Sequence, residues 1–112
     1  MKIIDYSQFT DVEIRSGTVV KTEEFPKARN PAYKVWVDFG EGFGIKQTSA
    51  QITQNYTLEG LIGQNVCGAL NLGTKNIAGF ISDFLLLGFE DQNGNIVLAA
   101  PKTEIPNGKK LH

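Results

Sequence analysis

The chain has 112 residues with one cysteine and one histidine, and its 11 basic and 12 acidic side chains give a formal net charge of −1. This length fits one domain, residues 1–112, which can bury a core without disulfides or a structural metal. The near-neutral charge argues against a protein that binds polyphosphate by bulk electrostatics, although residues 25–82 carry five basic and three acidic side chains and are mildly basic.

Membrane and secretory signals are missing from the sequence. It has no apolar run of about 18 residues, which a membrane-spanning helix needs, and its first residues lack the apolar segment of a signal peptide. A single cysteine fits a reducing compartment, so we expect a cytoplasmic protein.

Residues suited to catalysis are also scarce. The only histidine is His112, the last residue, and Cys67 is the only cysteine, so neither a zinc site of the usual kind nor a Ser-His-Asp or Cys-His set can be assembled. The adjacent Glu23 and Glu24 lie in a turn and look solvated. The glycine-rich residues 40–44 lack the Gly-Lys-Ser of a nucleotide-binding loop. We therefore expect no catalytic residue, no metal and no cofactor.

The first half of the chain predicts an arm followed by strands. Residues 1–11 read as an N-terminal arm with one helical turn capped by Ser7. Residues 12–22 alternate as a long strand, in which Gly17 predicts a bulge or sharp bend. Residues 33–39 are a period-2 strand whose inner face is Tyr33, Val35, Val37 and Phe39.

The loop between these strands, residues 23–31, is the most cationic loop of the chain. It contains Lys27 and Arg29, and Phe25 at its base is predicted to belong to the core. After the glycine turn, residues 44–48 predict a return strand. Lys46 then lies either on the face of Lys34 or on the opposite face, because the sequence does not fix the register.

The middle and the end of the chain predict short elements. In residues 49–63, Ser49 or Thr53 is expected to cap one short turn, and residues 57–63 form a second that ends at glycine. Strands are expected at residues 65–71, with Cys67 as a small buried side chain, and at residues 96–100. The latter follow an Asn-Gly turn, and residues 101–112 are an irregular tail.

The stretch from Asn71 to Gly88 is the most informative. Glycine and asparagine predict a turn at residues 71–76, and an apolar run follows that is too rich in β-formers and glycine to be a helix. Ser82 and Asp83 interrupt that run, and residues 84–87 predict a strand buried on both faces. A polar pair between buried runs predicts either a structural polar bridge or a binding surface.

Five or six strands, one short helical connection and many glycine bends favour an all-β fold. The prediction is a five-stranded Greek-key barrel of the oligonucleotide- and oligosaccharide-binding (OB) type. A β-sandwich would need more strands.

Several stretches, in order, resemble the tRNA-binding domain appended to some aminoacyl-tRNA synthetases. More narrowly, they resemble its stand-alone CsaA-type secretion chaperones, and the resemblance covers nearly the whole chain. The stretches that carry it are residues 11–19, 25–35, 38–40, 44–53, 77–83 and 106–109.

The resemblance implies an OB-fold homodimer in which residues 1–11 and 101–112 build the contact. It also implies two roles, structure-directed tRNA binding and binding of unfolded, export-bound polypeptides. Where CsaA-type chains usually carry a proline pair and an arginine pair, residues 73–76 here read Gly-Thr-Lys-Asn. The implied RNA-binding residues are Arg29, Lys34, Lys46, Asn71, Lys75 and Ser82.

Peptide binding would require an exposed apolar patch beside the dimer seam. Trp36 stands on an otherwise polar strand face, and it is either covered by a loop or helix or exposed for a partner. The candidates for the patch are Trp36, Phe43, Phe80 and Phe89. The expected function is a CsaA-like protein-export chaperone with tRNA-binding activity. The alternative is a purely structure-specific tRNA-binding module that acts in trans.

Overall fold

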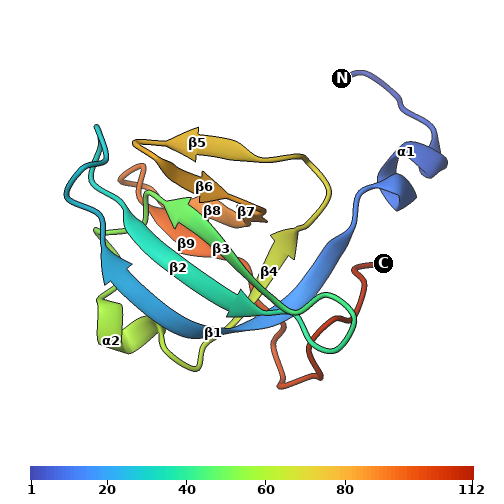
Figure 1. The fold of residues 1–112 in the computed structure, drawn as a ribbon. Helices are drawn as coiled ribbons and strands as arrows, with labels where there is room; N and C mark the ends of the chain where they lie inside the picture. The colour runs from blue at the N-terminus through green and yellow to red at the C-terminus, as the bar shows by residue number, and fades with distance from the viewer.

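The computed structural model describes residues 1–112 and consists mainly of strands (Figure 1). The two helices are α1 (Tyr6–Asp11) and α2 (Leu58–Leu61). The strands are β1 (Ile14–Glu24), β2 (Tyr33–Asp38), β3 (Ile45–Ala50), β4 (Asn65–Ala69), β5 (Lys75–Ile77), β6 (Phe80–Ser82), β7 (Leu85–Leu86), β8 (Gly88–Glu90) and β9 (Ile96–Leu98). The predicted all-β class is confirmed.

The main sheet is antiparallel, has the order β3-β2-β1-β4-β7 and curls into a nearly closed barrel of the OB type. The long strand β1 pairs with β2 through Thr18–Glu24 and with β4 through Ile14–Thr18, so one strand serves both sides as predicted. The bulge in β1 lies between Val19 and Lys21 and not at Gly17, so the predicted position was wrong.

Gly17 is required for a different reason, which is close packing. A Cβ atom at this position would lie 2.5 Å from Cγ1 of Val37 and 2.9 Å from the ring of Phe39. Both side chains are completely buried, which confirms the predicted inner face of β2. The ring of Phe39 in turn meets that of Phe84 edge-on at 4.9 Å. Because interiors are close-packed, only glycine lets β1 cross the core here.

The barrel closes between β3 and residues 81–84, which are the end of β6 and the chain just after it. Nε2 of Gln47 donates to the Ile81 carbonyl at 2.8 Å, and we name the three hydrogen bonds that follow it the closure seam. The Asp83 N–H donates to the Gln47 carbonyl at 2.8 Å, and the Ser49 N–H donates to Oγ of Ser82 at 2.9 Å. Oγ1 of Thr48 donates to the Phe84 carbonyl at 2.8 Å. Ser82 is therefore the structural polar bridge, the first of the two alternatives that the sequence left open.

The predicted strand over residues 84–87 was wrong in extent and burial. Phe84 is buried, but β7 contains only two residues, and Leu85 is 51% exposed. The closure seam occupies the chain up to Phe84, and only one side of β7 is paired, with β4. The apolar run therefore points alternately into the core and outward.

Residues 75–82 form a two-stranded hairpin, β5–β6, instead of one continuous run (Figure 1). Its turn places Ala78 at φ 48° and Gly79 at φ 88°, the positive values that a two-residue hairpin turn needs. Asn76 supports the turn, because its Oδ1 accepts a hydrogen bond from the Gly79 N–H at 2.8 Å.

The residues that cap the helices are not the predicted ones. α1 begins at Tyr6 after Asp5, whose N–H donates to Oε1 of Gln8, so the predicted cap at Ser7 was wrong. Ser49 does not cap a turn either, because it lies within β3, where it is paired with Lys34 of β2. α2 lies within the turn predicted over residues 57–63, and Gly63 follows it at φ 85°. Its cap, which the sequence did not predict, is Thr57, whose Oγ1 accepts from the Gly60 N–H. Neither helix has the length and apolar character that a membrane crossing demands.

Candidate nucleic-acid interface

A groove of about 580 Å³ runs between the loop of residues 25–32, the end of β3 and the β5–β6 hairpin. We call it the loop groove. It contains three of the six predicted RNA-binding residues, Arg29, Lys75 and Ser82. The other lining residues are Ala28, Asn30, Ala32, Thr48, Ser49, Gln51, Leu72, Gly73, Thr74, Ile77, Phe84 and Leu85.

The loop groove has the position and the charge of a nucleic-acid site. OB barrels bind oligonucleotides on the face of the second and third strands, between the loops that join strands one to two and four to five. The same loops flank the groove here. Arg29 and Lys75 are its charged residues, neither makes an ion pair within the chain, and no carboxylate lines it. Its electrostatics therefore favour an anion.

Lys34 and Lys46 lie outside the loop groove and on opposite faces of the sheet. Lys34 is opposite Ser49 on the outer face, whereas Lys46 is opposite the buried Val37. Opposed residues of an antiparallel pair point to the same side, so Lys46 leaves β3 on the inner side of the sheet. This register resolves the alternative that the sequence left open.

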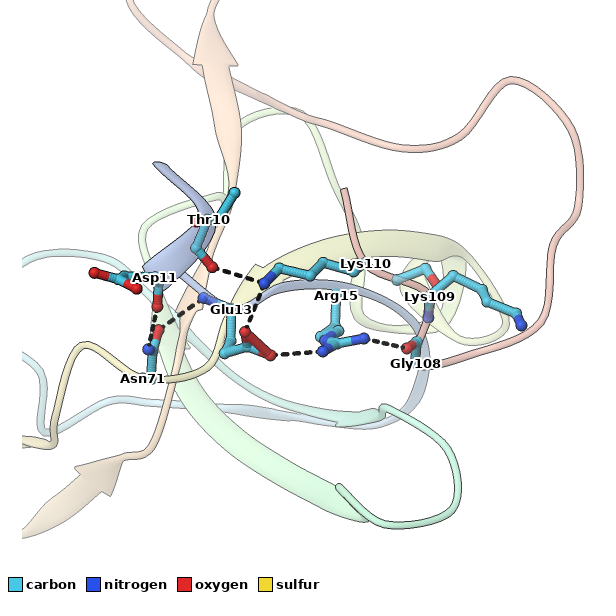
Figure 2. A network of polar contacts seen from close by, with 9 residues as sticks. Thr10, Asp11, Glu13, Arg15, Asn71, Gly108, Lys109 and Lys110 are labelled. Atoms are coloured by element: carbon cyan, nitrogen blue, oxygen red, sulfur yellow. Dashed lines mark hydrogen bonds and ion pairs between the residues drawn. The ribbon is translucent and has the colours of Figure 1, made fainter. Parts of the chain in front are cut away.

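Asn71 has a role that its prediction as an RNA-binding residue did not include. Its Oδ1 accepts a hydrogen bond from the Glu13 N–H at 2.8 Å, and its Nδ2 donates to the Asp11 carbonyl at 2.7 Å (Figure 2). The side chain thereby fixes the link between α1 and β1 to the end of β4. The next two residues, Leu72 and Gly73, line the loop groove.

The structure divides the four predicted peptide-binding aromatic residues. Trp36 and Phe80 meet edge-on at 5.8 Å, and Trp36 is half-buried beneath β6, so it is a covered tryptophan. Phe43 lies elsewhere, with the guanidinium of Arg15 4.8 Å from its ring centre. Phe89, on β8, is 73% exposed and apart from both.

A charged network ties the two ends of the chain to β1 (Figure 2). Oε1 of Glu13 accepts from Arg15 at 2.6 Å, and its Oε2 accepts from Nζ of Lys110 at 2.9 Å. Lys110 also donates to the Thr10 carbonyl, and Arg15 to the Gly108 carbonyl. The hydrogen bonds from Arg15 and then Lys110 hold the pKa of the Glu13 carboxyl below its ordinary value.

A second hollow, of about 590 Å³, lies between the C-terminal tail, β8 and the N-terminal end of β1, and we call it the tail hollow. It is largely apolar, and its lining includes Leu87, Phe89, Ile105 and Leu111. Cys67 also lines it and is only half-buried, less than predicted, and burial raises the pKa of its thiol. Of this surface, the sequence predicted Phe89 as a candidate for peptide binding and residues 101–112 as a dimer contact, but it did not predict that they line one hollow.

The chain belongs to the family described as "Putative tRNA binding domain", whose model matches residues 14–110. It is similar to the crystal structure of the chaperone CsaA from Bacillus anthracis, at 43% identity and a TM-score of 0.92, over 99% of this chain and 100% of that one. It is also similar to the CsaA chaperone from Picrophilus torridus, at 36% identity and a TM-score of 0.91, over 98% and 100% of the two chains. The predicted resemblance is confirmed.

Methionine–tRNA ligases are similar along the same length. That of Methanococcus vannielii is 34% identical over 100% of this chain, which corresponds to 16% of the ligase. That of Bacteroides fragilis is 28% identical over 96% of this chain and likewise 16% of the ligase. The chain therefore spans a small part of the curated relatives that it matches.

We predict that the Glu13 network makes stability depend on pH in the acid range. A carboxyl whose pKa is lowered by folding stabilises the folded state above its unfolded pKa, and this contribution disappears as pH falls through the folded value. The ordinary value is 4.5, so the loss occurs below that pH. The free energy of unfolding, measured with urea at pH 7 and at about pH 3, should fall less between the two pH values for Glu13→Gln than for the wild type.

The matched control is Glu41→Gln, which alters an exposed carboxylate that makes no ion pair. It should leave the acid dependence unchanged. An acid profile of Glu13→Gln identical to the wild-type profile would show that the network does not stabilise the folded state.

Proposed function

We propose that this chain binds tRNA without catalysis through the loop groove, acts as a homodimer in the cytoplasm, and serves as a CsaA-like protein-export chaperone. The observation that carries the RNA-binding part is the loop groove itself. The proposal is supported by two features of the groove: it contains Arg29 and Lys75 with no carboxylate, and it lies between the two loops that flank the oligonucleotide site of OB-type barrels.

The charge count sets the expected mode of binding. With a net charge of −1 and few cations at the groove, one subunit neutralises few phosphates and binds weakly at physiological salt. Structured RNA is recognised largely by its shape and by contacts to its 2′-hydroxyl groups and phosphates, a mode that a surface with few cations can use. A two-fold dimer would present two loop grooves, and simultaneous contact of both with one tRNA would raise the affinity.

The RNA-binding proposal is tested by titrating tRNA at several salt concentrations with Arg29→Ala and Lys75→Ala. Each substitution should weaken binding and reduce the slope of log K against log salt by about 0.7 to 0.9, the value of one phosphate contact. Lys102→Ala, at an exposed lysine of the tail, is the control and should change neither quantity. Lys46→Ala reports whether the RNA surface extends beyond the groove.

A tRNA affinity that changes neither with salt concentration nor with the two groove substitutions would contradict RNA binding through the loop groove. A wild-type slope retained in both groove variants, but reduced in Lys46→Ala, would move the RNA site to the part of β3 that carries Lys46, outside the loop groove.

The chaperone part is supported by the CsaA neighbours and by the tail hollow. Phe89 and Leu111 are exposed beside an apolar depression of about 590 Å³, which is a surface that suits extended apolar polypeptide. The termini add exposed apolar side chains, among them Ile3 and Tyr6 of the arm. Burying such side chains against a second subunit would stabilise a dimer.

The dimer and the client-binding role are tested with Phe89→Ser and the control Ile62→Ser, which changes another exposed apolar residue, next to α2 and away from the tail hollow. Light scattering of the wild type should give twice the 12.3 kDa subunit mass at micromolar concentration. The wild type and Ile62→Ser should suppress aggregation of an unfolded client, whereas Phe89→Ser should suppress it several-fold less.

A monomer mass refutes the homodimer. Absence of suppression at stoichiometric excess leaves the alternative, a tRNA-binding module alone.

A further inference from the structure

Lys34 has an unusual environment for a surface lysine. Its Nζ lies 4.9 Å from the ring centre of Phe25 and 5.0 Å from that of Phe80, and the two rings meet edge-on at 5.5 Å. It makes no ion pair, although Glu23 is directly opposite on β1. Glu23 is paired with Lys21 instead, at 3.2 Å.

Lys34 lines a hollow of about 410 Å³ that lies beside the loop groove, and we call it the lysine hollow. Its walls are the start of the loop of residues 25–32, with Phe25 and Lys27, and the tip of the β5–β6 hairpin, with Gly79 and Phe80. It has two cations and no carboxylate. The loop groove and the lysine hollow therefore lie between the same loop and the same hairpin.

Two aromatic faces hold an ammonium group differently from a carboxylate. A carboxylate would neutralise the charge and occupy the N–H donors, whereas ring faces attract the cation and leave its charge available. No hydrogen bond from Nζ of Lys34 to an acceptor is present, so its donors remain open to a ligand oxygen. A phosphate group suits such a fixed, unneutralised ammonium.

We propose that the lysine hollow binds one backbone phosphate of the RNA whose neighbouring phosphates contact the loop groove. In this arrangement, which rests on the proposed tRNA binding, Lys34, already implied as an RNA-binding residue by the family resemblance, contacts the phosphate. The structure adds the hollow around it, in which Phe25 and Phe80 are positioning residues that hold the ammonium of Lys34. A stacked base is the less suitable occupant, because Lys34 already covers the two rings. Phe80 therefore serves RNA binding through Lys34 and does not belong to a peptide-binding patch.

The test measures tRNA affinity against salt concentration for Lys34→Ala, Phe80→Leu and their combination. Each single substitution should lower the salt slope by about 0.7 to 0.9, the value of one phosphate contact. The double variant should be no weaker than Lys34→Ala, because both changes remove the same contact. Phe80→Tyr keeps the ring and should restore the wild-type slope.

A second cycle separates this role from a general effect on the hairpin. If Phe80→Leu acted by displacing β5, its effect would overlap with that of Lys75→Ala. The proposal expects Phe80→Leu and Lys75→Ala to be additive, since they remove contacts to different phosphates. Overlap with Lys75→Ala, or additivity with Lys34→Ala, overturns the positioning role. Phe89→Leu, at an exposed phenylalanine outside the hollow, is the control and should leave the slope unchanged.

A measurement without RNA keeps the proposal separate from the proposed function. Inorganic pyrophosphate is titrated while the NMR signals of the Lys34 methylenes and the Phe80 ring are followed, and both should shift in the wild type. In Lys34→Ala the Phe80 ring should no longer respond.

A full salt slope for tRNA in Lys34→Ala overturns the subsite and leaves the tRNA function intact. Failure of the wild type to bind tRNA, with the pyrophosphate shifts present, overturns the function but supports the anion site. Absence of those shifts overturns the site.

Discussion

The closure seam is the constraint on which the rest of this structure depends. A five-stranded barrel must join its first and last strands in space, and here Gln47, Thr48 and Ser49 of β3 meet the chain at residues 82–84 through hydroxyl and amide groups. A buried polar group without a hydrogen-bond partner costs free energy. All three bonds form together only when β3 and residues 82–84 are aligned in one register. The seam therefore fixes where β6 ends and where Phe84 enters the core.

From that fixed point, the functional surfaces follow. The β5–β6 hairpin ends at Ser82, so the seam holds the wall of the loop groove that contains Lys75. On the hairpin's other side, Phe80 reaches Phe25 and Trp36, which places Lys34 between the hairpin and the loop of residues 25–32. At the far end, Asn71 joins the same segment to α1 and β1, beside the network of Glu13 and Lys110 (Figure 2). The segment of residues 71–84 thus connects the loop groove with the N-terminal and C-terminal parts of the chain.

The sequence predicted features that depend on local pattern and missed features that depend on pairing. Alternation over residues 33–39 predicted the inner face of β2 correctly, and the Ser82–Asp83 interruption marked the polar bridge. The face of Lys46 required the β2–β3 register, and the burial of residues 84–87 required knowing that β7 is paired on one side only. Nothing in the sequence reveals that the side-chain amide of Asn71 is hydrogen-bonded to the backbone of Asp11 and Glu13, because these residues are 60 and 58 positions away in the chain. The aromatic environment of Lys34 arises from three separate elements and has no local signal.

Hydrogen bonds of the closure seam, and not a continuous strand ladder, hold the hairpin against the barrel. Amide hydrogen exchange of the Ser49 and Asp83 N–H groups measures this directly, because these two amides donate to Ser82 and Gln47 across the seam. If the seam holds the hairpin, both amides exchange as slowly as the core amides of β2, because they open only with the whole barrel. Exchange as fast as that of the exposed turn around Gly42 would show that the seam opens on its own and does not hold the hairpin.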